Sequence, residues 1–166
     1  AALGLWMNGQ RVGTWVLTAQ GEHQLHYDEG WLASPLGRPL SLSMPLRPAS
    51  APYKGELVRN YFENLLPDND NIRQRLAKRF STGTEAFSLL AEIGRDCVGA
   101  LQIMPDGENP PAIGAIQCAP LSSAEVAEHL AGTLTAPAFA QDDDSFRISI
   151  AGAQEKTALL WYRGNW

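Results

Sequence analysis

Hydrophobic and polar positions alternate along the first 27 residues, which is the period-two pattern of half-buried β-strands. The Asn8-Gly9 pair interrupts this alternation, and Asn-Gly is a strong hairpin signal because both residues tolerate a positive φ. A second turn is predicted at Ala19-Gln20-Gly21. The pattern therefore predicts a small antiparallel meander with strands at residues 3–7, 12–18 and 22–27.

The next stretch, residues 28–53, is rich in proline and serine. Within it, large hydrophobic residues alternate with small or constrained ones over residues 40–46, which predicts one more extended segment. The period then changes, because hydrophobic residues recur at helical spacing over residues 54–66. Pro67 is predicted to end this helix, since proline disfavours the helical conformation in the residue before it.

Two further helices and a strand are predicted before residue 105. Asp68, Asn69 or Asp70 can cap the first of these helices, which has one hydrophobic face. The second helix covers residues 86–93 and is closed by the glycine that follows it. A return to strand is predicted over residues 98–104.

The rest of the chain begins as a proline-rich loop and continues into another helix. Ser122 or Ser123 is predicted to cap this helix, which runs to Leu130 and has Glu125 in its first turn. Small and acidic residues follow at residues 133–144. This stretch is predicted to be a linker between two units.

The C-terminal residues return to the strand pattern. Strands are predicted at residues 146–150 and 157–162, and a turn at residues 163–165. A sheet that ended at Trp166 would be left unfinished with an exposed edge, so we expect this sheet to continue in a longer protein.

Taken together, the elements predict an α+β fold with an antiparallel sheet and several helices in a small N-terminal lobe. The predicted parts are an N-terminal subdomain at residues 1–104, a loop, helix and linker at residues 105–144, and the first strands of a second lobe at residues 145–166.

Charge and hydropathy narrow the possible partners. The chain has 13 basic and 18 acidic residues and a formal net charge of −5. A domain that grips nucleic acid by itself usually has a basic excess, so direct binding is disfavoured. The one basic run, Arg73, Arg75, Lys78 and Arg79, is typical of a solvated helix face. No apolar run approaches the roughly 20 residues that span a bilayer, and we expect a cytoplasmic protein.

Cysteine and histidine are sparse. Cys97 and Cys118 are not in a ligand spacing, and we interpret both as small buried hydrophobic residues of a reducing compartment. His23 and His26 lie three apart on a predicted strand, so their side chains are expected on opposite faces. His129 lies on the late helix, far from both. No metal site is expected.

The segment Phe146-Arg-Ile-Ser-Ile-Ala-Gly-Ala-Gln-Glu-Lys-Thr157 is the most informative one for chemistry. Small residues between two strands let the backbone approach a ligand, and successive N–H groups there can form an anion nest. Lys156 adds a positive charge. The segment is not a Walker A loop, because Glu155 stands where that motif needs glycine. The residues alone still favour an ordinary hairpin over a nucleotide loop.

Two other features have a structural and a functional interpretation. Ser149 lies on the polar side of a predicted strand, where serine is common, and next to a loop that a kinase could reach. Glu92, Arg95 and Asp96 surround a helix-to-strand turn. They are interpreted first as an ion-pair cluster that shapes the turn, and second as a docking surface.

Several segments together resemble the HipA family, the kinase toxins of bacterial persistence modules. They occur in the family's order and extend over nearly the whole chain. The segments are Trp6-Met-Asn-Gly-Gln-Arg-Val-Gly13, Trp31-Leu-Ala-Ser34, Arg38-Pro-Leu-Ser-Leu-Ser-Met-Pro-Leu46, Asn60-Tyr-Phe-Glu-Asn-Leu-Leu-Pro-Asp68, Glu92-Ile-Gly-Arg-Asp-Cys-Val-Gly-Ala100 and Phe146 to Leu160.

The resemblance implies a small α/β lobe followed by a kinase-like core that is distantly related to lipid kinases. It implies that Ser149 is the serine that the family autophosphorylates, which ejects the loop and inactivates the enzyme. A phosphate there would add about two negative charges beside the nest. The residues that match the loop over the ATP phosphates are Ala151, Gly152, Ala153, Gln154, Glu155 and Lys156.

The resemblance also implies cofactors and partners. ATP and Mg²⁺ serve the full-length family protein, and none is expected on this fragment, because the catalytic and metal-binding residues of the family lie beyond Trp166. The expected partners are a HipB-type helix-turn-helix antitoxin, operator DNA mainly through that antitoxin, and a protein substrate such as an aminoacyl-tRNA synthetase. The alternative is a stand-alone, non-catalytic lobe that acts as a binding or antitoxin-like module.

Overall fold

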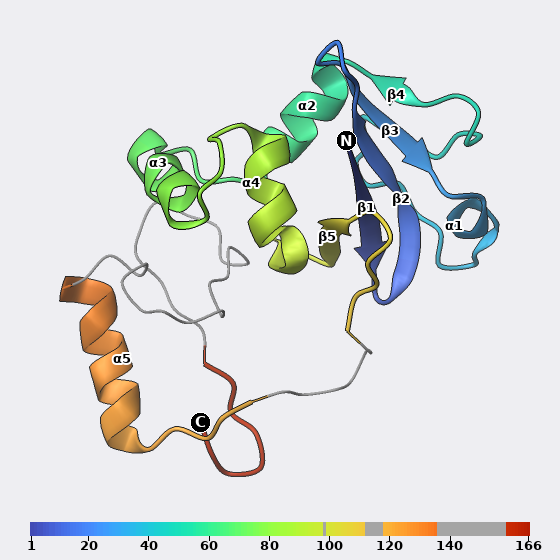
Figure 1. The fold of residues 1–166 in the computed structure, drawn as a ribbon. Coiled ribbons are helices and arrows are strands. Elements are labelled where there is room, and N and C mark those ends of the chain that lie inside the picture. The colour runs from blue at the N-terminus through green and yellow to red at the C-terminus, as the bar shows by residue number, and fades with distance from the viewer. Residues whose placement is uncertain (98, 112–117, 136–158) are drawn as a thin grey trace.

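The computed structural model describes residues 1–97, 99–111, 118–135 and 159–166 (Figure 1). They form a mixed α+β arrangement around a five-stranded antiparallel sheet of order β4-β3-β2-β1-β5. The strands are β1 (Ala2–Met7), β2 (Gln10–Leu17), β3 (His23–Tyr27), β4 (Tyr53–Lys54) and β5 (Leu101–Pro105). The helices are α1 (Glu29–Ala33), α2 (Glu56–Glu63), α3 (Asp70–Arg79), α4 (Ala86–Ile93), the 3-10 turn η1 (Gly94–Asp96) and α5 (Ser123–Thr135).

Strands β1, β2 and β3 form the predicted meander. Asn8 and Gly9 have φ values of 48° and 73°, so the turn has the left-handed conformation that an Asn-Gly pair accepts at low cost. In the resulting register, Trp15 lies opposite Leu3 on one side and opposite Leu25 on the other. Paired residues share a face of the sheet, so these three side chains begin the hydrophobic core.

The two outer strands come from distant parts of the sequence. Strand β5 pairs with β1, and β4 pairs with β3 through two residues only. The sequence pattern did not indicate β4, because two residues are too few to show a period. It also started the later strand too early, since Gly99 has a φ of 86° and turns the chain before Leu101.

Helix α2 is shorter than predicted at both ends. Gly55 precedes it with a φ of 74°, so Lys54 belongs to β4 instead of to the helix. Residues 64–66 lie after its last turn. Two of the predicted hydrophobic positions, Val58 and Phe62, are fully buried, whereas Leu57 is 41% exposed.

The next two helices agree more closely with the prediction. Of the three candidate caps for α3, Asn69 is the one used, and its side-chain oxygen accepts from the N–H of Asn71 at 2.9 Å. Helix α4 has the predicted bounds and ends at Gly94. Helix α1, whose cap is Asp28, was not predicted, because a single helical turn shows no hydrophobic period.

Trp15 connects the sheet to the helices. Helices α2 and α4 pack against strands β3 and β5 (Figure 1), and the Trp15 side chain is completely buried. Its ring is stacked on Phe62 of α2 with centroids 3.7 Å apart and meets the edge of Phe87 of α4 at 4.8 Å. Aromatic pairs of this kind add stabilisation beyond the area that they bury.

The extended segment predicted over residues 40–46 is wrong. Ser41 and Met44 form an isolated bridge around a tight turn, and Leu42 is 98% exposed. The backbone of this segment forms hydrogen bonds with a side chain of the sheet instead of with a neighbouring strand. The Tyr27 hydroxyl donates to the Met44 carbonyl at 2.6 Å and accepts from the Leu40 N–H at 3.0 Å.

Helix α5 is longer than predicted and includes residues 131–135, so the first part of the predicted linker is helical. Ser122 precedes the helix and exchanges three hydrogen bonds with Glu125, one of which runs from the Ser122 hydroxyl to the Glu125 carboxylate at 2.7 Å. The Glu125 carboxylate accepts from the Ser122 N–H at 2.7 Å, and the Glu125 N–H donates to the Ser122 hydroxyl at 3.3 Å. This capping box selects Ser122 over Ser123.

The described part of the last predicted strand is irregular. Residues 159–161 have no strand assignment, so the prediction for residues 157–162 is wrong over that part. The turn that follows is present: Arg163 and Gly164 have positive φ, and Tyr162 bridges to Asn165. The strand predicted at residues 146–150 and the start of this one lie outside the described residues.

Gly94 allows α4 to turn closely onto β5. A Cβ atom at Gly94 would lie 2.7 Å from the Cβ of Ile103, which is a fully buried residue. The substitution Gly94→Ala is therefore expected to lower the free energy of unfolding by about 1–3 kcal/mol, since neither neighbour can move freely. Urea denaturation followed by circular dichroism measures this change.

Gly83→Ala is the matched control. A Cβ at Gly83 would find its nearest neighbour, Ser88, at 3.7 Å, which is an ordinary contact. The control is expected to change stability by less than about 0.5 kcal/mol. Equal effects of the two substitutions would show that close approach at Gly94 is not the reason for a glycine there.

Candidate functional site

The residues expected to contact a nucleotide lie outside the described residues. This applies to the expected phosphosite Ser149 and to the loop from Ala151 through Gly152, Ala153, Gln154 and Glu155 to Lys156. Their assignment stays a prediction from the sequence. The site chemistry that the structure does describe is on α3.

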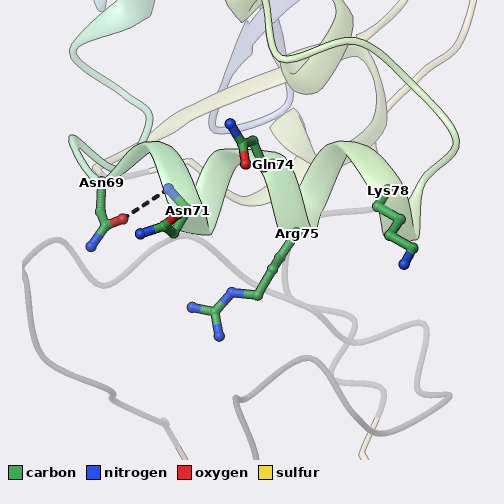
Figure 2. Close-up of a pocket in the computed structure, with 5 residues that line it drawn as sticks. All are labelled: Asn69, Asn71, Gln74, Arg75 and Lys78. Carbon is green, nitrogen blue, oxygen red and sulfur yellow. Dashed lines mark hydrogen bonds between the residues drawn. The ribbon is translucent and has the colours of Figure 1, made fainter.

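A cleft of about 580 Å³ runs along α3 (Figure 2). Three of its five lining residues, Asn71, Arg75 and Lys78, recur at the spacing that places side chains on one helix face. Figure 2 shows the Arg75 and Lys78 side chains extending away from the helix backbone, while the Asn69 amide turns back to cap the first turn. The lining residues are Asn69, Asn71, Gln74, Arg75 and Lys78.

The lining chemistry suits an anion. It contains two cations and three side-chain amides, and none of the five residues is a carboxylate. Pockets for small organic ligands are lined mainly by apolar side chains, which this cleft lacks. The five residues include no carboxylate, histidine, hydroxyl or thiol group, so the lining favours binding of a carboxylate or phosphate group over acid–base catalysis.

Arg73 does not belong to a solvated basic face, and the interpretation of the four basic residues as one such face is wrong for it. Its side chain is only 17% exposed and pairs with Glu63 at 2.6 Å. It also donates to the carbonyls of Pro67 at 2.7 Å and Glu63 at 3.3 Å. Arg73 therefore ties the start of α3 to the end of α2.

The carboxylates near α3 line a second, smaller cleft of about 340 Å³. There the side chains of Glu63, Asp70 and Glu85 accompany Arg59 and Arg73, so both signs of charge are present. The sequence analysis did not distinguish the two clefts. The polar residues at three- and four-residue spacing beside the basic run are a sequence signal for the larger cleft. The Arg73–Glu63 pair, which joins residues from two helices, lines the second cleft.

The histidines of β3 point to opposite faces, as predicted. His23 lies opposite Leu17, and His26 lies opposite Thr14. The Nδ1 of His23 accepts a hydrogen bond from the Trp15 indole at 3.1 Å, and burial lowers the pKa of His23. Within the described ranges no group of three His, Cys, Asp or Glu residues could hold a metal ion.

The two cysteines differ, which corrects the expectation that both are buried. Cys97 is buried and donates to the Gly94 carbonyl at 3.3 Å, whereas Cys118 is exposed. Burial raises the pKa of Cys97 to about 12. The sequence could not separate them, because the positions differ only in their tertiary surroundings.

The turn at residues 92–96 shows a different ion pair from the predicted cluster. Arg95 pairs with Glu108 at 2.8 Å, and both side chains are largely exposed, so the pair adds little stability. Its role as a docking surface stays a prediction. In the part of the chain that the structure describes, no helix has the length and apolar character needed to cross a membrane.

Comparisons with known proteins identify the fold. The model of the HipA N-terminal domain matches residues 3–104. The chain belongs to this family. The resemblance seen in the sequence is thereby confirmed.

Two similar proteins extend the comparison beyond the HipA N-terminal domain. Putative kinase Y4mE of Sinorhizobium fredii is 33% identical over 168 residues, which is 98% of this chain and 39% of that protein. Serine/threonine-protein kinase toxin HipA of Shewanella oneidensis is 28% identical over 137 residues, 82% of this chain and 30% of that protein.

A solved structure supports the same family relationship as these two proteins. It holds the HipA and HipB proteins of a Shewanella oneidensis toxin–antitoxin system with operator DNA, and it matches with a TM-score of 0.68 and 25% identity. The match covers 98% of this chain and 36% of the solved chain. This chain therefore spans less than two-fifths of the length of the relatives that it matches.

The bonds of Arg73 predict a stability effect. Arg73→Met keeps the hydrocarbon stem but removes three hydrogen bonds and leaves the half-buried Glu63 carboxylate unpaired, so we expect a loss of about 2–4 kcal/mol. Lys78→Met, on the open cleft of the same helix, is the control and is expected to stay within about 0.5 kcal/mol. Chemical unfolding of both variants measures the difference, and similar losses would contradict the anchoring role of Arg73.

The cysteine environments predict selective alkylation. A thiol with a pKa of about 12 is almost entirely protonated at pH 8, and burial also blocks access, so Cys97 should resist iodoacetamide. Cys118 should react. Mass spectrometry of the native chain should therefore find one label on Cys118, and two labels after unfolding. Rapid native labelling of Cys97 would show that α4 and β5 separate readily.

Proposed function

We propose that this chain is the N-terminal part of a HipA-type serine/threonine protein kinase toxin of a toxin–antitoxin module. The observation that carries the proposal is the agreement of the family match over residues 3–104 with a 33% identical kinase-named relative along 98% of the chain. The full-length protein would use ATP and Mg²⁺ to phosphorylate a protein target such as an aminoacyl-tRNA synthetase. This chain alone would be inactive.

The proposed division of labour follows the three parts of the sequence. Residues 1–104 form the small subdomain, residues 105–144 connect it, and residues 145–166 begin the kinase-like lobe. In that lobe the segment from Ala151 to Lys156 would hold phosphate through backbone N–H groups and the Lys156 ammonium. Catalytic and metal-binding carboxylates would come from the remainder of the longer protein.

Ser149 is the proposed off-switch. Transfer of a phosphoryl group to its hydroxyl would place about two negative charges next to a loop that binds phosphate, and like charges repel. The same proposal assigns a HipB-type antitoxin as the partner, with operator DNA bound mainly through it. The structure of HipA and HipB with operator DNA supports this assignment, because this chain resembles it over 98% of its length.

The full-length protein tests the kinase proposal. Incubated with labelled ATP and Mg²⁺, it is expected to label itself on Ser149, and Ser149→Ala should reduce that label at least tenfold. Ser145→Ala, four residues earlier, is the matched control and should retain the label. Absence of phosphorylation by the full-length protein, or full labelling of the Ser149→Ala variant, would contradict the proposal. Phosphorylation by the 166-residue chain alone would contradict its inactivity.

The alternative is a stand-alone, non-catalytic lobe that restrains a separately encoded kinase. The match of the family model to residues 3–104 is compatible with it. The two proposals predict different lengths for the intact protein in the cell. An intact mass near 18.1 kDa, with copurification of a kinase, would favour the separate module. A much larger single polypeptide would favour the toxin.

A further inference from the structure

His23 closes an aromatic stack that begins inside the core. Its imidazole is stacked on Trp15, with centroids 5.6 Å apart, and Trp15 is stacked in turn on Phe62. The Trp15 indole N–H donates to Nδ1 of His23 at 3.1 Å. An imidazole nitrogen can accept only when it carries no proton, so this bond requires the neutral ring with its proton on Nε2.

We propose that His23 is a proton-sensitive latch, which holds the Trp15 indole and the packing of α2 against the sheet only while its imidazole is neutral. The proposal goes beyond the kinase assignment and does not depend on it.

Protonation of His23 removes the acceptor. Nδ1 then carries a hydrogen that faces the indole N–H of Trp15, and two donors cannot bond to each other. Trp15 is completely buried, so water cannot easily replace the lost acceptor. A buried donor without a partner is costly, and the folded state with a charged His23 is disfavoured for that reason.

The effect reaches α2 through two contacts. The N–H of Gly55, the residue that precedes α2, donates to the carbonyl of His23 at 2.8 Å. The Trp15 ring, which His23 orients, is stacked on Phe62 at the other end of the helix. A shift of the imidazole or the indole therefore disturbs both ends of α2.

The charges around His23 oppose each other. Arg59 of α2 disfavours the imidazolium, whereas Glu56 and Glu63 of α2 and Glu85 before α4 favour it. Across the sheet on β2, His23 faces the uncharged Leu17, and Lys54 of β4 pairs instead with Gln24. Burial acts with Arg59, and together they lower the pKa of His23 despite the three glutamates.

The direction of this shift fixes the pH window. The folded pKa of His23 lies below the ordinary value of 6.5, so in between these values the unfolded chain binds a proton that the folded chain does not. The stabilisation is fully present above pH 6.5. It is lost progressively as the pH falls through the interval toward the folded pKa.

NMR of the folded 166-residue chain between pH 8 and pH 5 tests the latch. The Trp15 indole N–H resonance, assigned with a Trp15→Phe variant, is expected to shift together with the His23 ring resonances at a common midpoint below pH 6.5. His23→Gln supplies an amide oxygen acceptor that does not titrate, and in this variant the indole shift should disappear. His26→Gln, on the same strand but the opposite face, should retain it.

Urea denaturation provides the second readout. Between pH 7.5 and pH 5.5 the folding equilibrium constant of the wild-type chain is expected to fall further than that of His23→Gln, by at most about tenfold, because the ordinary pKa of 6.5 in the unfolded chain sets that limit. An indole resonance of Trp15 that does not follow the His23 titration would overturn the proposal. An unchanged indole transition in His23→Gln would overturn it as well. If that variant does not fold, the wild-type titration alone decides, because the two midpoints either coincide or differ.

Discussion

The burial of Trp15 between the sheet and two helices is the interaction on which the remaining structure depends. Its strand is central in the meander, and its ring meets Phe62 from α2 and Phe87 from α4. The indole brings one polar atom into the core, and the N–H of that indole needs an acceptor. His23 supplies it from the next strand. The Trp15 side chain thus links the pairing of two strands to the packing of two helices. It also links both to the protonation state of His23.

A second constraint closes the domain around this stack. Strand β5 lies against β1 after the chain turns tightly at Gly94, where α4 approaches Ile103 without room for a side chain. On the other side of the helical layer, Arg73 fixes the start of α3 to the end of α2 through Glu63 and Pro67. The first contact joins α4 to the sheet and the second joins α2 to α3, so both connect elements that are separate in the sequence.

Local signals and tertiary signals explain what the sequence could predict. The meander, the bounds of α4 and the Asn-Gly turn depend on neighbouring residues, and these predictions are confirmed. The prediction of an extended segment at residues 40–46 failed because the hydroxyl group of Tyr27, which is distant in sequence, bonds the backbone there. Arg73 was misplaced for the same reason, since Glu63 lies on another helix. The family was recognisable from segments in order, whereas the loop from Ala151 to Lys156 lies outside the described residues and stays a prediction.

The described residues include groups that suit ligand binding but no recognisable catalytic arrangement. The α3 cleft presents Arg75 and Lys78 with three amides and no carboxylate, which suits an anionic group, and its five lining residues include no histidine, hydroxyl or thiol group. The core also contains the thiol of Cys97, and burial keeps this thiol protonated. In the HipA-type kinase that we propose, phosphoryl transfer is assigned to residues beyond this subdomain. The subdomain would contribute a rigid sheet whose packing is fixed by Trp15, and a polar helix face on which an anionic partner could bind.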